Sequence, residues 1–447
     1  MLLHGLFLSI QLVLVGLLVY EKVFLERFKF QFTSWFLLIY YLTLVVVPFA
    51  IVLFFDGFRR INTAIQDQYF DLGVIYILNM YQLYLLIGFY IVRFLKSKPC
   101  SPWTVFPEDE LKFYFRIMSL ISCLGLVIFL YAVGSNPLAL ISAGRFSWFL
   151  DPTANIFLVA ISQYFIAAVM LVCALFILVG KTKLNIFIFV VVLLVVVSYS
   201  LISLDRKFII FFVSGSFAGI YLKNNQKLNL TKKTITVSSL LFGFMILSQM
   251  ARDLLARYLT IDNMSPAAYL YGFKDQVVYF IEYGDISYFY RASLESIAIS
   301  LEEGILAPGA LVIRNLLFFL PSSITFGIKP PDISATFSVY VNGAAGGRAG
   351  NMPPGVFGLY VASFGVYWSA MLLVSLPFCL RMLDNLVRKS RFWAFVLGST
   401  CLSSSLFFMR GDDSTAIYFP LFIALCLGFS MLAYRLTWGS YALSKNR

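Results

Sequence analysis

Residues 186–222 read IFIFVVVLLVVVSYSLISL-DRK-FIIFFVSGSFAGIYL, which is two apolar runs separated by one charged triplet. An α-helix needs about 20 residues to cross the hydrocarbon core of a bilayer, which is about 30 Å thick. The first run has this length and the second falls a little short of it. The stretch therefore predicts two membrane-spanning helices joined by a short polar link.

Apolar runs of this kind recur along the whole chain. The predicted spans are Leu2–Tyr20, Phe32–Phe55, Leu72–Val92, Phe113–Val133, Ala154–Val179, Ile186–Leu204, Phe208–Leu222, Thr234–Met250, Gly355–Leu380, Phe392–Met409 and Ala416–Tyr434. We expect an all-α integral membrane protein with about 11 transmembrane helices. Residues 1–250 would hold helices one to eight, residues 251–352 one large periplasmic loop, and residues 353–447 the last three helices with a cytoplasmic C-terminus.

Composition supports lipid as the solvent. Of the 447 residues, 60% are hydrophobic and only 13% are charged, which is too little polar surface for a soluble protein of this size. The net charge of +12 does not indicate nucleic acid binding, because the charges lie in short links between apolar runs. No cysteine lies in the long loop, so no disulfide framework is indicated, and His4 is the single histidine, so a histidine-dependent triad is excluded.

Charge distribution predicts the orientation. Lys and Arg are enriched in the links that share a side with the C-terminus, and cytoplasmic links carry this excess. We therefore expect the N-terminus outside and the C-terminus in the cytoplasm. The first run has no basic segment before it and no small-residue cleavage site after it, which favours an uncleaved first span.

The long loop contains segments of distinct composition that suit a binding site. Met264–Tyr290 is rich in tyrosine, and Ser293–Glu303 has the apolar spacing of an amphipathic helix. Ala310–Leu320 is too short to span, so we expect it to lie in the interface or to form a re-entrant helix. Rings and scattered charges suit a sugar-binding cleft. The alternative is that the tyrosines sit at the membrane–water interface for their own stability.

Arginines recur at the predicted outer face. A guanidinium binds phosphate oxygens through two parallel hydrogen bonds and keeps its charge, so such residues could hold a diphosphate without a metal. For Asp205-Arg206-Lys207 the alternative is a hairpin turn with an internal ion pair. Asp412-Asp413 could instead hold Mg²⁺, although our expectation is a site with no metal or cofactor. The candidate binding residues are Arg145, Arg206, Arg252, Arg257, Arg314 and Arg348.

With these residues the chain resembles the Wzy-type polymerases of lipid-linked oligosaccharide repeat units, the O-antigen and enterobacterial common antigen polymerase family. The resemblance is diffuse and covers nearly the whole chain. The segments that carry it are Phe28–Phe32, Gly144-Arg145-Phe146, Arg206, Ala256-Arg257-Tyr258, Ile313–Pro321, Asn351–Gly358 and Arg410-Gly411-Asp412-Asp413.

The resemblance implies a reaction and a location. An oligosaccharide on undecaprenyl diphosphate would be transferred as a block to the non-reducing end of a new lipid-linked unit, with undecaprenyl diphosphate leaving. This would occur at the periplasmic face of the bacterial inner membrane, with a chain-length regulator as a further candidate partner. The related O-antigen ligases use a histidine in the large loop, which this chain lacks.

A base must take the proton of the acceptor hydroxyl. The candidates are the outer carboxylates Asp253, Asp332, Asp412 and Asp413 and the loop glutamates, and we favour Asp412 or Asp413. Arg206, Arg257 and Arg314 would bind the diphosphate, and Arg348 or Arg410 would act on the acceptor side or on transition-state charge.

Two other functions stay open. A flippase for the same lipid-linked units is one, although transporters tend to have repeats and charges at mid-membrane. Another is a different multi-span polyprenyl-dependent glycosyltransferase, which would use a carboxylate of the first outer loop, where Asp56, Asp67 and Asp71 lie.

Overall fold

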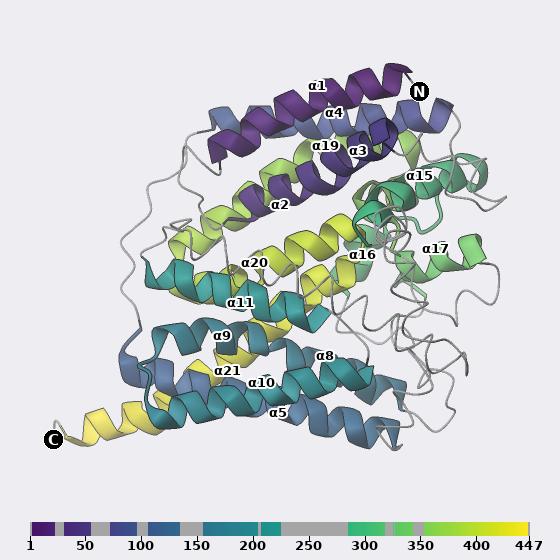
Figure 1. Ribbon diagram of the computed structural model, residues 1–447. Helices are drawn as coiled ribbons and strands as arrows, with labels where there is room; N and C mark the ends of the chain where they lie inside the picture. Colours follow the sequence, from purple (N-terminus) through teal and green to yellow (C-terminus); the bar gives the residue numbers. More distant parts are fainter. Residues whose placement is uncertain are drawn as a thin grey trace, which may run out of the picture.

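The computed structural model describes residues 2–22, 31–54, 72–95, 106–134, 155–203, 207–224, 285–317, 325, 327–342 and 353–445. All regular structure within these ranges is helical. Helices lie side by side in a bundle, with the N-terminus at one end and the C-terminus at the other (Figure 1).

The helices of the bundle follow the predicted runs. Their bounds are α1 Leu2–Tyr20, α2 Phe32–Tyr40, the π-helix η2 Tyr41–Val46, α3 Val47–Phe54, α4 Leu72–Phe94, α5 Glu108–Val133, α8 Ile156–Ala167, α9 Val169–Leu178, α10 Lys183–Ser203, α11 Lys207–Lys223, α19 Gly355–Lys389, α20 Arg391–Arg410 and α21 Asp413–Lys445. Three further helices are α15 Asp285–Glu303, α16 Ala310–Leu316 and α17 Ile333–Asn342.

Length and hydropathy indicate a multi-pass membrane protein. Eight helical segments among the described residues are long and apolar enough to cross a membrane, and two shorter apolar helices cover His4–Tyr20 and Ile210–Lys223. Every predicted run within the described residues therefore coincides with one helix or with helices in series. The eighth run, Thr234–Met250, lies outside the described residues. The total of eleven spans stays a prediction.

Small residues let helices in the bundle approach closely. Gly215 and Gly219, one turn apart on α11, face backbone atoms of Met170 and Ala174 on α9, so a Cβ at either glycine would clash with that backbone. Close approach through small residues replaces the hydrophobic drive that helices lack in lipid. In contrast, α10 exposes Phe187, Val190 and Leu194 at helical spacing, a stripe suited to acyl chains.

The longest helix, α19, changes direction at Gly365. Its φ of 74° and ψ of 171° are not helical, and this left-handed φ favours glycine. Tyr81 of α4 donates a 2.6 Å hydrogen bond from its hydroxyl to the carbonyl of Val366. A neighbouring helix thus supplies a hydrogen bond to a backbone carbonyl next to the non-helical Gly365.

Helices α15, α16 and α17 gather at the end of the bundle that also holds the N-terminus (Figure 1). The helix expected at Ser293–Glu303 is confirmed as part of α15, and every residue from 292 to 300 is buried, whereas residues 301–303 are exposed. The reason is that α15 packs against α19, α4 and η2 at once. Its small residues, among them Ser293 and Ser296, fit against the start of α19, where Ser296 donates to the carbonyl of Pro354 at 3.0 Å.

Candidate active site at the α20–α21 turn

The turn between α20 and α21 is short and closely packed. Gly411 ends α20 with a φ of 92°, and the amide of Asp412 donates to the carbonyl of Phe407 at 2.9 Å, which gives a Schellman-type cap. A Cβ at Gly411 would clash with the backbone of Pro354 and Gly355, where α19 begins. The turn is therefore fixed in place, and so are the charged residues on either side of Gly411.

Asp412 is used as a helix cap. Its Oδ1 accepts from the amide of Thr415 at 3.0 Å, and its Oδ2 accepts from the Thr415 hydroxyl at 2.6 Å. An aspartate that precedes the first residue of a helix commonly satisfies an amide in the first turn, which α21 would otherwise leave unpaired. Both oxygens of Asp412 are thus engaged within its own helix start.

Arg314 of α16 forms an ion pair with Asp332. The distance from Arg314 Nη2 to Asp332 Oδ2 is 3.1 Å, and Arg314 Nη1 donates to the carbonyl of Pro330 at 3.1 Å. Asp332 also caps α17, because its Oδ1 accepts from the amides of Ser334 and Ala335. The Ser414 hydroxyl donates to Asp332 Oδ2 at 3.4 Å, which joins this pair to the start of α21.

Asp413 is the third carboxylate of the group and the most enclosed, with 2% of the residue exposed. Asn315 of α16 donates from Nδ2 to Asp413 Oδ2 at 2.7 Å. Asp413 is the first residue of α21, where a negative charge interacts favourably with the helix dipole. Of the three aspartates, Asp413 is the one that caps no helix.

Arg410 lies on the other side of Gly411 and faces an aromatic ring. Its guanidinium carbon is 5.9 Å from the centre of the Tyr288 ring, and that of Arg291 is 5.5 Å from the same centre. The Tyr288 hydroxyl donates to the carbonyl of Pro353 at 2.8 Å, which fixes the ring. Arg291 in turn pairs with buried Glu295 at 3.3 Å. Two cations thus gather at one tyrosine of α15.

Several buried polar atoms at this end have no hydrogen-bond partner among the described residues. They include Nε of Arg314, Nε of Arg410 and Oδ1 of Asn315. Burial raises the pKa of Glu295, and Arg291 opposes that rise. Burial, together with the charge of Arg314, lowers the pKa of Lys329. A substrate with hydroxyl and phosphate oxygens can satisfy donors and acceptors of this kind.

The structure brings together four of the residues singled out in the sequence: Arg314, Asp332, Asp412 and Asp413. Arg410 is on the same turn, with its side chain toward Tyr288. Three of the loop glutamates, Glu295, Glu302 and Glu303, lie on α15. The other predicted arginines and aspartates lie outside the described ranges. They are Arg145, Arg206, Arg252, Arg257, Arg348 and Asp253, together with Asp56, Asp67 and Asp71 of the alternative glycosyltransferase.

Sequence reasoning gave no role to Asn315 or Arg291. Arg291 could have been found from its spacing of four residues from Glu295, which places the two side chains together on a helix. Asn315 gave no such signal, because its partner Asp413 is far away in the sequence. Within the part of the chain that is described, no three His, Cys, Asp or Glu residues group as metal ligands would.

Searches for similar proteins found no matching family model, no matching curated protein and no matching solved structure.

Proposed function

We propose that this chain is a polymerase of lipid-linked oligosaccharide repeat units, with its working site at the α20–α21 turn. The observation that carries the proposal is the enclosed carboxylate Asp413, held by Asn315 next to the Arg314–Asp332 pair, with Arg410 three residues before it. A base, an array of hydrogen-bonding groups and an arginine therefore share one short turn and the helices around it.

Asp413 is the proposed general base. The acceptor sugar hydroxyl gives its proton to the Asp413 carboxylate while its oxygen attacks the anomeric carbon of the donor. The bond from that carbon to the diphosphate oxygen breaks, and undecaprenyl diphosphate leaves with the electron pair. Asp412 and Asp332 suit this role less, because each caps a helix and has both oxygens engaged.

Arg410 is the proposed partner of the diphosphate, a role that the sequence alone assigned to Arg206, Arg257 and Arg314. Among the described residues Arg410 has no ion pair with a carboxylate, whereas both Nη atoms of Arg314 are bonded within the site. A guanidinium that is not neutralised can stabilise the negative charge that grows on the leaving group. In this proposal Arg314 is a positioning residue, which holds Asp332 and through it the start of α21.

In the proposed topology the chain crosses the bacterial inner membrane eleven times. Residues 251–352 form a loop on the periplasmic side. In support, the site lies at the end of the bundle that holds the N-terminus, which the charge bias predicts to be outside (Figure 1). α16 exposes Val312 and Leu316, as a helix resting in the interface would. The undecaprenyl chain could then stay in the bilayer while its head reaches the turn.

The test compares two neighbouring aspartates. In a bacterial strain whose surface glycan ladder depends on this chain, Asp413→Asn should reduce polymerised glycan by about 100-fold, the lower end of what a general base contributes. Asp412→Asn should keep the ladder, because asparagine caps a helix about as well as aspartate. Gel analysis of the surface glycan reads both.

Asp109→Asn, an exposed aspartate at the start of α5, controls for expression and for the loss of one charge. Loss of the ladder with single units still exported supports a polymerase. Loss of all exported units in Asp413→Asn would assign the site to a flippase and end the polymerase proposal. An unchanged ladder in Asp413→Asn would show that this carboxylate is not the base.

A further inference from the structure

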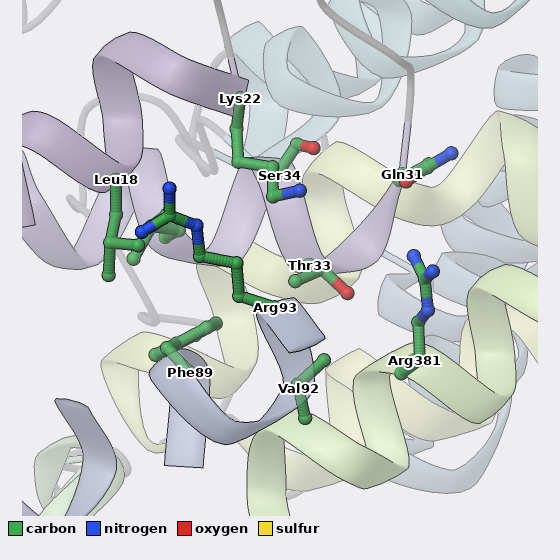
Figure 2. Close-up of a pocket in the computed structure, with 10 residues that line it drawn as sticks. Leu18, Lys22, Gln31, Thr33, Ser34, Phe89, Val92, Arg93 and Arg381 are labelled. Atoms are coloured by element: carbon green, nitrogen blue, oxygen red, sulfur yellow. The ribbon is translucent and has the colours of Figure 1, made fainter. Parts of the chain in front are cut away.

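A second polar site lies between α1, α2, α4 and α19, well away from the α20–α21 turn. Figure 2 shows a pocket lined by Lys22, Gln31, Thr33, Ser34, Arg93 and Arg381, with Leu18, Phe89 and Val92 in its apolar wall. Leu37 completes that wall. Its empty space is about 460 Å³, the open mouth included. The part of this space that water-sized molecules can occupy is only about 30 Å³, so a ligand could place no more than a small group inside.

Cationic side chains dominate the polar wall. Lys22 follows α1, Arg93 belongs to the last turn of α4, and Arg381 lies on α19, so three separate helices each bring one positive charge to the pocket. Figure 2 shows Arg93 and Arg381 on either side of Thr33. Two acidic groups are beside them, because Glu21 pairs with Arg93 at 2.9 Å and Asp384 accepts from the Thr33 hydroxyl. Among the described residues, three basic side chains thus meet two carboxylates at this pocket.

The start of α2 forms the floor of the pocket. Asp384 of α19 is fully buried and accepts from the amides of Phe32 and Thr33 at 2.7 Å and 3.3 Å, and also from the Thr33 hydroxyl. Asp384 therefore fixes the first turn of α2 from a distant part of the chain. Thr33 and Ser34, which line the pocket, are held by this arrangement.

The other wall of the pocket is apolar and adjoins the lipid-facing surface. Leu18 and Val92 line the pocket, while their sequence neighbours Leu17 and Ile91 are 58% and 43% exposed. Phe94, at the end of α4, is 80% exposed. A ligand in this pocket would thus meet cations on one side and hydrocarbon on the other, as an amphiphile does.

We infer that this pocket binds the phosphate group of an anionic phospholipid from the leaflet at this end of the bundle. The charge bias of the links predicts that end to be cytoplasmic, where anionic lipids and basic pockets between helices coincide. Guanidinium groups of Arg93 and Arg381 would hold the phosphate, and Lys22 would add charge. The apolar wall would receive the start of an acyl chain. This inference is independent of the proposed function.

The test titrates phosphatidylglycerol into the purified full-length chain in neutral detergent and follows thermal unfolding. Half-maximal stabilisation should need at least tenfold more phosphatidylglycerol in the double variant Arg93→Gln/Arg381→Gln, since each basic residue near an anionic headgroup contributes a factor of about five. Arg116→Gln, an exposed arginine on α5, is the matched control and should titrate like the unaltered chain.

Two further arms identify the source of the phosphate. Phosphatidylcholine should have the same effect on the melting temperature of the unaltered chain and of the variants. Glycerol phosphate tests whether a water-soluble phosphate ester is enough to stabilise the protein. Stabilisation by both phosphatidylglycerol and glycerol phosphate would assign the pocket to phosphate esters, and stabilisation by phosphatidylglycerol alone would assign it to lipid. Equal titration by the double variant and the unaltered chain would overturn the inference.

A single variant covers the case in which the double variant does not fold. Lys22 follows the end of α1, and Lys22→Gln removes one of the three positive charges. The amount of phosphatidylglycerol that stays bound through purification, measured by mass spectrometry, should therefore fall. Retention equal to that of the unaltered chain would overturn the inference by this second route.

Discussion

At the scale of single residues, what separates three nearby aspartates is the number of hydrogen bonds already made. Asp332 and Asp412 each accept from the first turn of a helix, and such a cap stabilises the fold by about 1 kcal/mol. Asp413 accepts from the Asn315 amide and is the most enclosed of the three. Chemistry is better assigned to a carboxylate that the fold does not use for capping.

Glu295 offers a residue-scale prediction that depends on pH. Burial raises its pKa above the ordinary value of 4.5, so the folded state binds a proton more tightly than the unfolded state does. Its contribution to stability is therefore complete below pH 4.5 and is lost as pH rises through the higher folded value. The melting temperature should therefore fall as the pH rises from 4.5 through the raised pKa of Glu295.

Glu295→Gln keeps the shape and removes the titration, so its melting temperature should change less over the same window. Thermal unfolding of both proteins in one detergent, at steps of pH from 4 upward, measures the difference. Glu302→Gln, at an exposed position on the same helix, should behave like the unaltered chain. Parallel curves for Glu295→Gln and the unaltered chain would contradict the prediction.

At the scale of elements, the turn between α20 and α21 depends on one glycine. Gly411→Ala should lower the free energy of unfolding by at least about 1–2 kcal/mol, because its φ of 92° is strained for alanine and its Cβ would meet the start of α19. Chemical denaturation in detergent measures this loss. Gly398→Ala, within α20 and with open space for a Cβ, should be neutral or slightly stabilising.

The long apolar helices of this chain could be predicted from sequence because a bilayer admits little else. Lipid cannot satisfy backbone groups, so a run such as Ile186–Leu204 has to be helical whatever surrounds it, and α10 covers its described part, which ends at Ser203. The buried state of α15 could not be predicted in the same way. Its apolar spacing fits an interfacial helix equally well, and burial depends on contacts with α19 and α4.

Candidate site residues were predictable by type but not by pairing. A charge beside an apolar run stands out, which singled out Arg314, Arg410 and the Asp412-Asp413 doublet. Which of them meet depends on how α16, α17 and α21 are placed. The contacts of Arg314 with Asp332 and of Asn315 with Asp413 join segments with no shared periodicity. Their roles, base and phosphate binding, stay proposals.

At the scale of the whole molecule, the candidate active site and the pocket between α1, α2, α4 and α19 occupy different places in the bundle. The candidate active site lies with α15, α16 and α17, and the C-terminus lies at the opposite end (Figure 1). If the bundle spans a membrane, these two ends face different compartments. The predicted orientation assigns the site to the outside and the C-terminus to the cytoplasm.

Surface labelling of introduced cysteines tests this arrangement. Glu303→Cys, at the exposed end of α15, should react in intact cells with a thiol reagent that cannot cross the inner membrane. Asp109→Cys, exposed at the start of α5 in a link predicted to be cytoplasmic, should react only after the membrane is opened. The unaltered chain, with its native cysteines, sets the baseline. Reversal of the two results would put the α20–α21 turn in the cytoplasm, where a periplasmic glycan substrate could not reach Asp413.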